Sequence, residues 1–242
     1  MRQRTPSRGV AGRLARVDFA GVGRDLDALG HATIPGLVTG RECAGLIACY
    51  GRRERFWKHV DMARHRFGEG EYRYFARPLP EIVHALRREL YPPLAGIANR
   101  WMKALGERFT YPRTLDAFLA RCAAHGQTDP TPLLLRYQAG GYNCLHQDLY
   151  GAVAFPLQVT VLLSEPEADF RGGEFLLVEQ RARQQSRGDA IALRRGEAIV
   201  FPSSVRPVPS ARGVARARTR HGVSRILEGE RYTLGIIFHD AR

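Results

Sequence analysis

The hydrophobic period of the chain changes at Asp129-Pro130-Thr131-Pro132. Beyond this point, short apolar stretches alternate with glycine and proline turns, a pattern typical of an all-β sandwich or barrel. The predicted strands are residues 133–138, 142–146, 153–163, 174–179, 190–193, 198–201, 214–221 and 232–238. Eight strands suit a double-stranded β-helix, the jelly-roll or cupin-like architecture. Residues 133–242 are therefore predicted to form a jelly-roll domain.

The chain before this domain is predicted to be mainly helical. Residues 1–17 are rich in Arg, Gly, Ser and Pro, which predicts a flexible basic tail. Residues 18–132 contain apolar positions at helical spacing, with a capping box at Thr39 and Glu42 and a helix break at Pro92-Pro93. The expected fold class of the whole chain is therefore α+β.

The chain carries an excess of positive charge, and nearly all of it is arginine. There are 37 basic and 24 acidic residues, for a formal net charge of +13. Codon drift from lysine to arginine explains the residue type, whereas a polyanionic partner such as nucleic acid explains the excess. Residues 52–77 mix basic and aromatic side chains, which fits either base stacking or buried rings whose charged neighbours reach solvent.

The sequence also bears on location. It has no apolar run long enough for a membrane span, and its basic N-terminus lacks the apolar stretch of a secretory signal. The four cysteines show no paired spacing, which favours reduced thiols. We therefore expect a cytoplasmic protein without a membrane partner.

A His-Gln-Asp triplet places His146 and Asp148 one residue apart. On an extended strand the two side chains share a face, because strand side chains alternate. An imidazole and a carboxylate are two of the three ligands in the facial triad of non-haem Fe(II), and His221, at the end of another predicted strand, is the candidate third. Arg231 and Thr233 alternate onto one face of the last strand, where they could grip a carboxylate.

This order of motifs, His-x-Asp, then His, then Arg-x-Thr, resembles that of the 2-oxoglutarate/Fe(II)-dependent dioxygenases over residues 133–242. The resemblance implies that His146, Asp148 and His221 bind Fe(II). It also implies that Arg231, assisted by Thr233, binds the distal carboxylate of 2-oxoglutarate. The expected activity is that of an oxidoreductase that consumes O2 and 2-oxoglutarate and releases succinate and CO2.

Two branches of this superfamily compete. The spacing from His221 to Arg231 is similar to that of the prolyl hydroxylases, whereas Arg136-Tyr137 followed by His-Gln-Asp is similar to the AlkB-type nucleic-acid dealkylases. By the second resemblance Tyr137 hydrogen-bonds 2-oxoglutarate. Leu135 stands where that family has Asn, and its paired arginines after the second histidine are missing apart from Arg231. The chain also resembles a bacterial oxygenase family proposed to act on damaged DNA, which implies demethylation of alkylated nucleic acid with release of formaldehyde.

The segment 206–220 leads directly into His221 and is expected to lie near the mouth of the site. Its arginines could hold a nucleic-acid strand, either single-stranded or with a base flipped from a duplex, or could protect an exposed edge strand by charge. The candidate contacts are Arg206, Arg212, Arg216, Arg218 and Arg220. The alternative functions are a prolyl-hydroxylase-like or small-molecule hydroxylase and a non-catalytic module that senses metal or binds nucleic acid. The sequence leaves the lesion and the oligomeric state open.

Overall fold

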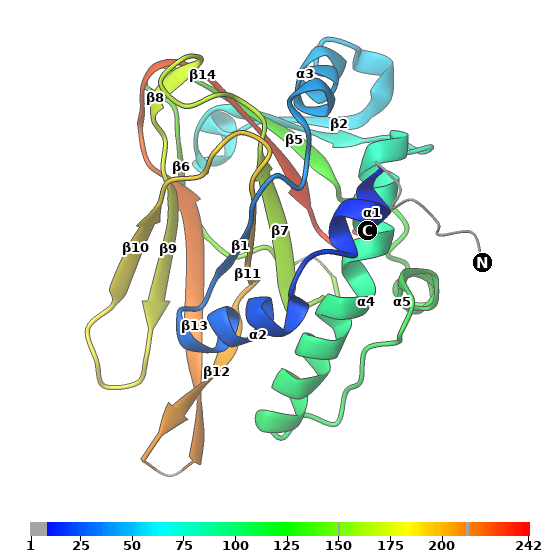
Figure 1. Ribbon diagram of the computed structural model, residues 1–242, viewed down its shortest axis with the longest axis vertical. Coiled ribbons are helices and arrows are strands. Elements are labelled where there is room, and N and C mark those ends of the chain that lie inside the picture. The colour runs from blue at the N-terminus through cyan, green and yellow to red at the C-terminus, as the bar shows by residue number, and fades with distance from the viewer. Residues whose placement is uncertain (1–8, 150, 212) are drawn as a thin grey trace, which may run out of the picture.

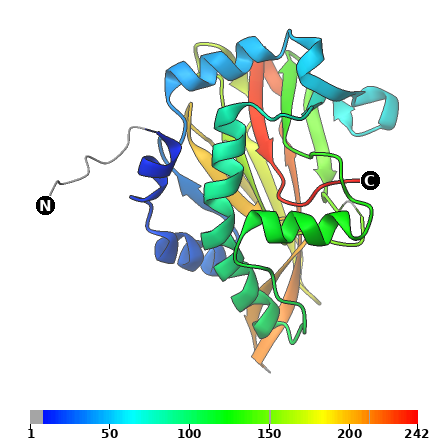
Figure 2. The same cartoon turned by 90° about the vertical axis from the view of Figure 1, so that its right-hand side faces the viewer.

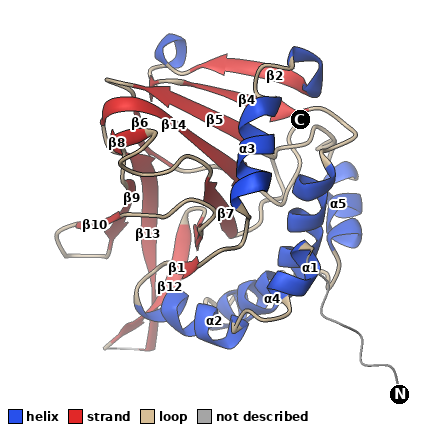
Figure 3. Cartoon of the chain, turned by 45° about the horizontal axis from the view of Figure 1, so that its top comes forward, coloured by secondary structure: helices blue, strands red, loops and turns tan. Residues whose placement is uncertain are grey.

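The computed structural model describes residues 9–149, 151–211 and 213–242. Two antiparallel sheets face one another, and most helices lie on the outer side of the larger sheet (Figures 1 and 3). The larger sheet runs in the order β1 (Ala32–Ile34), β11 (Ala198–Pro202), β7 (Leu157–Leu162), β14 (Ile226–Ile236), β5 (Leu133–Gln138), β4 (Glu71–Phe75), β2 (Phe56–Asp61), and β8 (Phe170–Gly172) pairs with β14. The smaller sheet runs β10 (Arg187–Ile191), β9 (Phe175–Gln180), β13 (Gly213–Val223), β6 (Tyr142–His146), β3 (Gly68–Glu69), and β12 (Val205–Ser210) pairs with β13. This arrangement is the expected jelly-roll core within an α+β fold.

All eight predicted strands occur, most of them with shifted ends. Strands β5 and β6 have the predicted bounds, because apolar residues and turn signals delimit both. Among the described residues after 132, two strands were not predicted. Strand β8 has only three residues, and β12 contains Pro207 and Pro209, which read as turn residues in the sequence.

The helices are α1 (Val10–Leu14), α2 (Phe19–Ala28), α3 (Gly40–Cys49), α4 (Glu81–Ala104) and α5 (Leu115–Ala123), with short 3₁₀ turns η1 (Arg53–Arg55) and η2 (Ala63–His65). The capping box at Thr39 and Glu42 is confirmed at the start of α3. The predicted break at Pro92-Pro93 is wrong, since α4 runs through both prolines. Their rings lie toward solvent while Tyr91 and Leu94 are fully buried, so packing of the opposite face sustains the helix. None of the helices described is long and apolar enough to cross a membrane.

The predicted flexible tail is corrected in part. Residues 1–8 lie outside the described residues, but Val10 and Leu14 in α1 are buried in the main core. Arg13 is held by an ion pair to Glu42 at 2.8 Å and by a hydrogen bond from its Nε to Leu37 O at 2.7 Å. Two apolar side chains one helical turn apart are therefore enough to dock this segment.

The predicted boundary at residue 132 does not divide the structure. Strands β1, β2 and β4 from the first half join the larger sheet, and β3 joins the smaller one. The region 18–132 is thus not only helical, because residues 56–75 contain the whole of β2, β3 and β4. Tyr74 on β4 lies opposite Leu133 on β5, so pairing across the boundary outweighs the local pattern.

Helices α4 and α5 cover one face of the larger sheet (Figure 2, in green), and the main core lies between them and the strands. Strand β7 shows how the two faces differ. Val159 and Val161 belong to this core, whereas Gln158 and Thr160 alternate onto the other face and line a cavity between the sheets. The inner face of the larger sheet is therefore more polar, and it carries the candidate site.

Candidate active site

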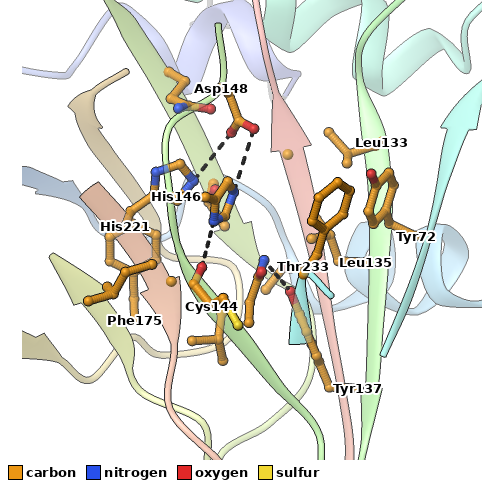
Figure 4. Close-up of a pocket in the computed structure, with 18 of the residues that line it drawn as sticks. Tyr72, Leu133, Leu135, Tyr137, Cys144, His146, Asp148, Phe175, His221 and Thr233 are labelled. Atoms are coloured by element: carbon orange, nitrogen blue, oxygen red, sulfur yellow. Dashed lines mark hydrogen bonds and ion pairs between the residues drawn. The ribbon is translucent and has the colours of Figure 1, made fainter. Parts of the chain in front are cut away.

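Three metal-ligating side chains meet between the two sheets. His146 ends β6, Asp148 lies in the loop that follows, and His221 on β13 stands opposite His146. The Asp148 carboxylate lies 3.5 Å from His146 Nε2 and 3.3 Å from His221 Nε2. One ligand atom from each residue lies within 4.8 Å of the others, and the side chains converge in Figure 4. The structure thus brings the predicted triad together, although β6 ends before Asp148.

Hydrogen bonds and burial fix the orientation of this triad. His146 Nδ1 lies 2.8 Å from Cys144 O, and because a carbonyl only accepts, Nδ1 carries the proton and Nε2 keeps its lone pair for a metal. Burial lowers the pKa of His221, so its imidazole is neutral at neutral pH, as a metal ligand must be. Gln147 Nε2 donates to Thr219 O at 2.7 Å and to Ser204 O at 3.1 Å, which anchors the ligand loop against β13.

Arg231 lies in the same cavity, whose volume is about 340 Å³. It stands on β14 opposite Tyr137, and only 2% of its surface is exposed. Its Nε and Nη1 have no hydrogen-bond partner among the residues that the structure describes. Burial lowers the pKa of Arg231 to about 10, so the guanidinium remains charged at neutral pH. A buried, unpaired charge destabilises the fold, and a carboxylate bound there would relieve this cost.

Two hydroxyl groups share the cavity with this cation. Thr233 lies two residues along β14 on the same face, and Tyr137 accepts a hydrogen bond from Asn143 Nδ2 at 3.1 Å. Burial raises the pKa of Tyr137, so its hydroxyl stays protonated and can also donate. A triad with an open side fits Fe(II), and a buried cation with two hydroxyls fits a dicarboxylate such as 2-oxoglutarate. The binding roles of Arg231, Thr233 and Tyr137 stay predictions.

Several cavity residues were not singled out from the sequence. Tyr72 and Tyr74 come from β4, and the sequence offered them only as two of the rings in the basic and aromatic segment 52–77, with no sign that they line this cavity. Asn143, Gln158 and Phe175 had no such signal, because their positions depend on how the two sheets close.

The described arginines before His221 are either exposed on β13 or, in the case of Arg206, buried. Arg216, Arg218 and Arg220 alternate onto one exposed face of β13, as predicted. Arg216 forms an ion pair with Glu107, whereas Arg218 and Arg220 line a groove of about 480 Å³. Gln147 lines both this groove and the cavity that holds the triad, so the groove borders the candidate metal site.

Arg206 is a correction, and Arg212 lies outside the described residues. The Arg206 side chain is completely buried, with Nε 2.5 Å from Glu179 Oε2 and Nη1 2.8 Å from Asp27 O. A guanidinium enclosed by a carboxylate and carbonyls ties α2 to the smaller sheet and is not available to nucleic acid. The predicted nucleic-acid contact at Arg206 is therefore wrong.

A family model matches residues 70–241, and its description is an oxygenase catalysing oxidative methylation of damaged DNA. Two uncharacterized proteins from two strains of Mycobacterium tuberculosis are each 51% identical to the chain over 167 residues, which is 69% of the chain and 72% of each relative. The residues that the family model matches include His146, Asp148, His221 and Arg231.

Solved structures share the fold at low sequence identity. An oxidoreductase of the 2OG-Fe(II) oxygenase family from Burkholderia pseudomallei gives a TM-score of 0.56 at 17% identity, over 93% of this chain and 94% of that one. A prolyl-4-hydroxylase from Pseudomonas putida gives 0.52 at 17% identity, over 93% and 99%. An alpha ketoglutarate dependent epimerase of nogalamycin biosynthesis gives 0.55 at 14% identity, over 90% and 80%. These proteins differ in reaction, so the likeness is one of architecture.

Proposed function

Because the chain belongs to the oxygenase family that matches residues 70–241, we propose that it oxidatively demethylates damaged nucleic acid. It is a 2-oxoglutarate/Fe(II) oxygenase by family and fold. The main support for 2-oxoglutarate as cosubstrate is the buried Arg231, which lies in the same cavity as the triad and has no hydrogen-bond partner for Nε and Nη1 among the described residues. Neither O2 nor 2-oxoglutarate has a methyl group to donate, so oxidation of a methyl group already on the base is the consistent reaction.

The chain's own residues would bind and position the reactants. His146, Asp148 and His221 would hold Fe(II) from one side and leave its other side open to the cavity. Arg231, with Thr233, would bind the distal carboxylate of 2-oxoglutarate. When both are bound, iron and 2-oxoglutarate would allow O2 to oxidise a C–H bond of the substrate. The protein's tasks are orientation and exclusion of water, so no general base is required.

The overall reaction balances without another reductant. One O2 and one 2-oxoglutarate convert N–CH3 to N–CH2OH, with succinate and CO2 as the other products. The N–C bond of the N–CH2OH group then breaks. The CH2OH carbon leaves as formaldehyde, and the hydroxyl proton ends on the nitrogen, which restores N–H on the base.

The surface beside the cavity supports nucleic acid as the substrate. Arg218 and Arg220 face the groove that Gln147 shares with the triad cavity, and phosphates are the natural partners of such arginines. The net charge of +13 adds long-range attraction for a polyanion. A strand held in this groove would pass the triad, and a base from a duplex would have to be flipped out to enter.

The test is incubation of the full chain with Fe(II), 2-oxoglutarate and oligonucleotides that carry N-methylated bases, in single strands and in duplexes. We expect loss of one CH2 mass per repaired base, with equal amounts of formaldehyde and succinate. His146→Ala should abolish all three signals. Arg231→Gln should raise the KM for 2-oxoglutarate roughly 100-fold, because a charge-assisted pair is lost from a buried site.

Two outcomes would overturn the proposal. Full activity of His146→Ala would exclude the triad as the metal site. Hydroxylation of a proline-rich peptide with no action on any methylated oligonucleotide would leave the oxygenase assignment in place and replace the substrate with a protein.

A further inference from the structure

The cavity contains a buried amide that neither the metal nor 2-oxoglutarate accounts for. Gln158 on β7 lines it with 4% of its surface exposed, and its Nε2 has no hydrogen-bond partner among the described residues. The other buried, unpartnered side-chain nitrogens of this cavity, within the described part of the chain, belong to His221 and Arg231. The proposed function assigns 2-oxoglutarate to Arg231 and the metal to His221, whose unpartnered atom is the ring nitrogen Nδ1 and not the Nε2 that faces Asp148. An unpaired buried amide is destabilising, and a ligand that forms a hydrogen bond with it would relieve this cost.

Strand register places Gln158 at the end of the cavity remote from Arg231. Thr233 on β14 pairs with Leu162 on β7, and Gly235 pairs with Thr160. Continuing this antiparallel register sets Gln158 level with Ile237, six residues from Arg231 (237 minus 231), or roughly 20 Å along the strand. The five-carbon chain of 2-oxoglutarate, held at Arg231, does not span this distance. A 2-oxoglutarate molecule bound at Arg231 would thus lie toward the other end of the cavity, which leaves the Gln158 amide available to a substrate.

The walls at this end of the cavity suit a flat ring. Leu133 and Ile237 line it together with Tyr72 and Tyr74, whose rings meet edge to face at 5.5 Å. Gly235 lets Leu133 pack closely against β14 at this end, since a Cβ there would lie 2.7 Å from Leu133 Cδ2. Ligand sites are typically apolar with a few polar groups that fix orientation, and the Gln158 amide is such a group here.

We propose that Gln158 is a specificity residue whose amide hydrogen-bonds the polar edge of the methylated nucleobase. This inference rests on the proposed function and names the part of the chain that recognises the base. A glutamine amide offers donors and an acceptor side by side, which matches a nucleobase edge that presents an acceptor next to a donor. The tyrosines and leucine around it contact the ring faces, which are common to all bases, so discrimination falls to the amide.

The test compares Gln158→Leu, which keeps the approximate shape of the side chain, with the full wild-type chain and a matched control. The control is Gln138→Leu on β5, an exposed glutamine that lies outside the cavity and bonds Glu230. For Gln158→Leu we expect kcat/KM for a methylated oligonucleotide to fall tenfold or more, an order-of-magnitude figure for a lost buried hydrogen bond. The KM for 2-oxoglutarate should stay at the wild-type value. In the absence of substrate its Tm should rise by about 2 °C, because an unpaired buried donor has been removed.

A structural role predicts the reverse pattern, with a lower Tm and a loss of activity that follows the loss of folded protein. Wild-type kcat/KM in Gln158→Leu, or a rise in its KM for 2-oxoglutarate as large as its loss of kcat/KM, would overturn the inference while the proposed function stands. If the wild-type chain acts on no methylated oligonucleotide, the proposed function fails, and the inference, which names a nucleobase, fails with it.

Discussion

His239 follows the last strand and is completely buried, with Phe155 N donating to its Nδ1 at 3.2 Å. Burial, reinforced by the positive charge of Arg87, lowers its pKa to about 4. The same group titrates near 6.5 in an unfolded chain. Between these values the unfolded chain binds a proton that the folded protein does not, so stability is complete above pH 6.5 and is lost as the pH falls toward 4.

We expect this histidine alone to lower the free energy of unfolding by up to about 3 kcal/mol between those two pH values. His239→Asn retains an acceptor for Phe155 N without a titrating ring, so its stability should fall less steeply over the same range. Urea denaturation at several pH values measures both slopes, and His125→Asn, at an exposed histidine, controls for loss of an imidazole. Parallel curves for wild type and His239→Asn would contradict the assignment.

Single residues were predictable from the sequence where a motif fixed both their type and their spacing. His146, His221, Arg231, Thr233 and Tyr137 reach one cavity from strands whose alternation can be seen in the sequence, and Asp148 joins them from the loop that directly follows β6. The role of Gln158 was not predictable, since one polar residue in an apolar strand gives no sign of what its side chain faces. Arg206 was misjudged for the same reason: its burial depends on Glu179, a residue from a different strand.

At the scale of elements, β13 combines two tasks on opposite faces. His221 and Thr219 point inward and are buried, while Arg218 and Arg220 point outward into the groove. Within the described residues, neither of these arginines forms an ion pair. Alternation thus places two unpaired cations beside the strand that carries a metal ligand.

Replacing both with glutamine should weaken binding of single-stranded nucleic acid and flatten its salt dependence. Two lost phosphate contacts reduce the slope of log K against log salt by about 1.4 for a single strand. Fluorescence anisotropy across a salt series measures this change. The control is Arg24→Gln with Arg88→Gln, which removes two exposed arginines from α2 and α4. If the two double variants lose equal slope, the binding follows net charge and not the β13 groove.

Elements differ in how far local sequence determined them. Strands β5 and β6 were bounded correctly because Gly and Pro turns frame them. Helix α4 continues through Pro92 and Pro93 because its apolar face packs against the core along most of its length. Strands β2 and β4 were missed because both are short and mix aromatic with basic residues, and their conformation depends on the pairing of β2 with β4 and of β4 with β5.

At the scale of the molecule, the jelly roll is completed by the chain that precedes it. Strand β4 pairs with β5 and β1 pairs with β11, so both flanks of the C-terminal part of the larger sheet are covered by N-terminal strands. Helix α4 adds Arg87, which reaches across to donate to Phe238 O at 2.8 Å and to Asp240 at 2.7 Å. The sequence showed a change of hydrophobic period near residue 132, but strands from both sides of this point pair within the same sheets.

Residues 133–242 expressed alone should therefore fail to form the native fold. The fragment would expose two sheet edges and the apolar face that α4 and α5 cover, which favours association over folding. We expect aggregation in size-exclusion chromatography and poorly dispersed amide signals by NMR, whereas the full chain should unfold in one cooperative transition. Coexpression with residues 1–132 tests the cause, because non-covalent pairing of β4 with β5 should restore solubility. A fragment that is monomeric, well dispersed and unfolds cooperatively by itself would show that the jelly roll is an independent domain after all.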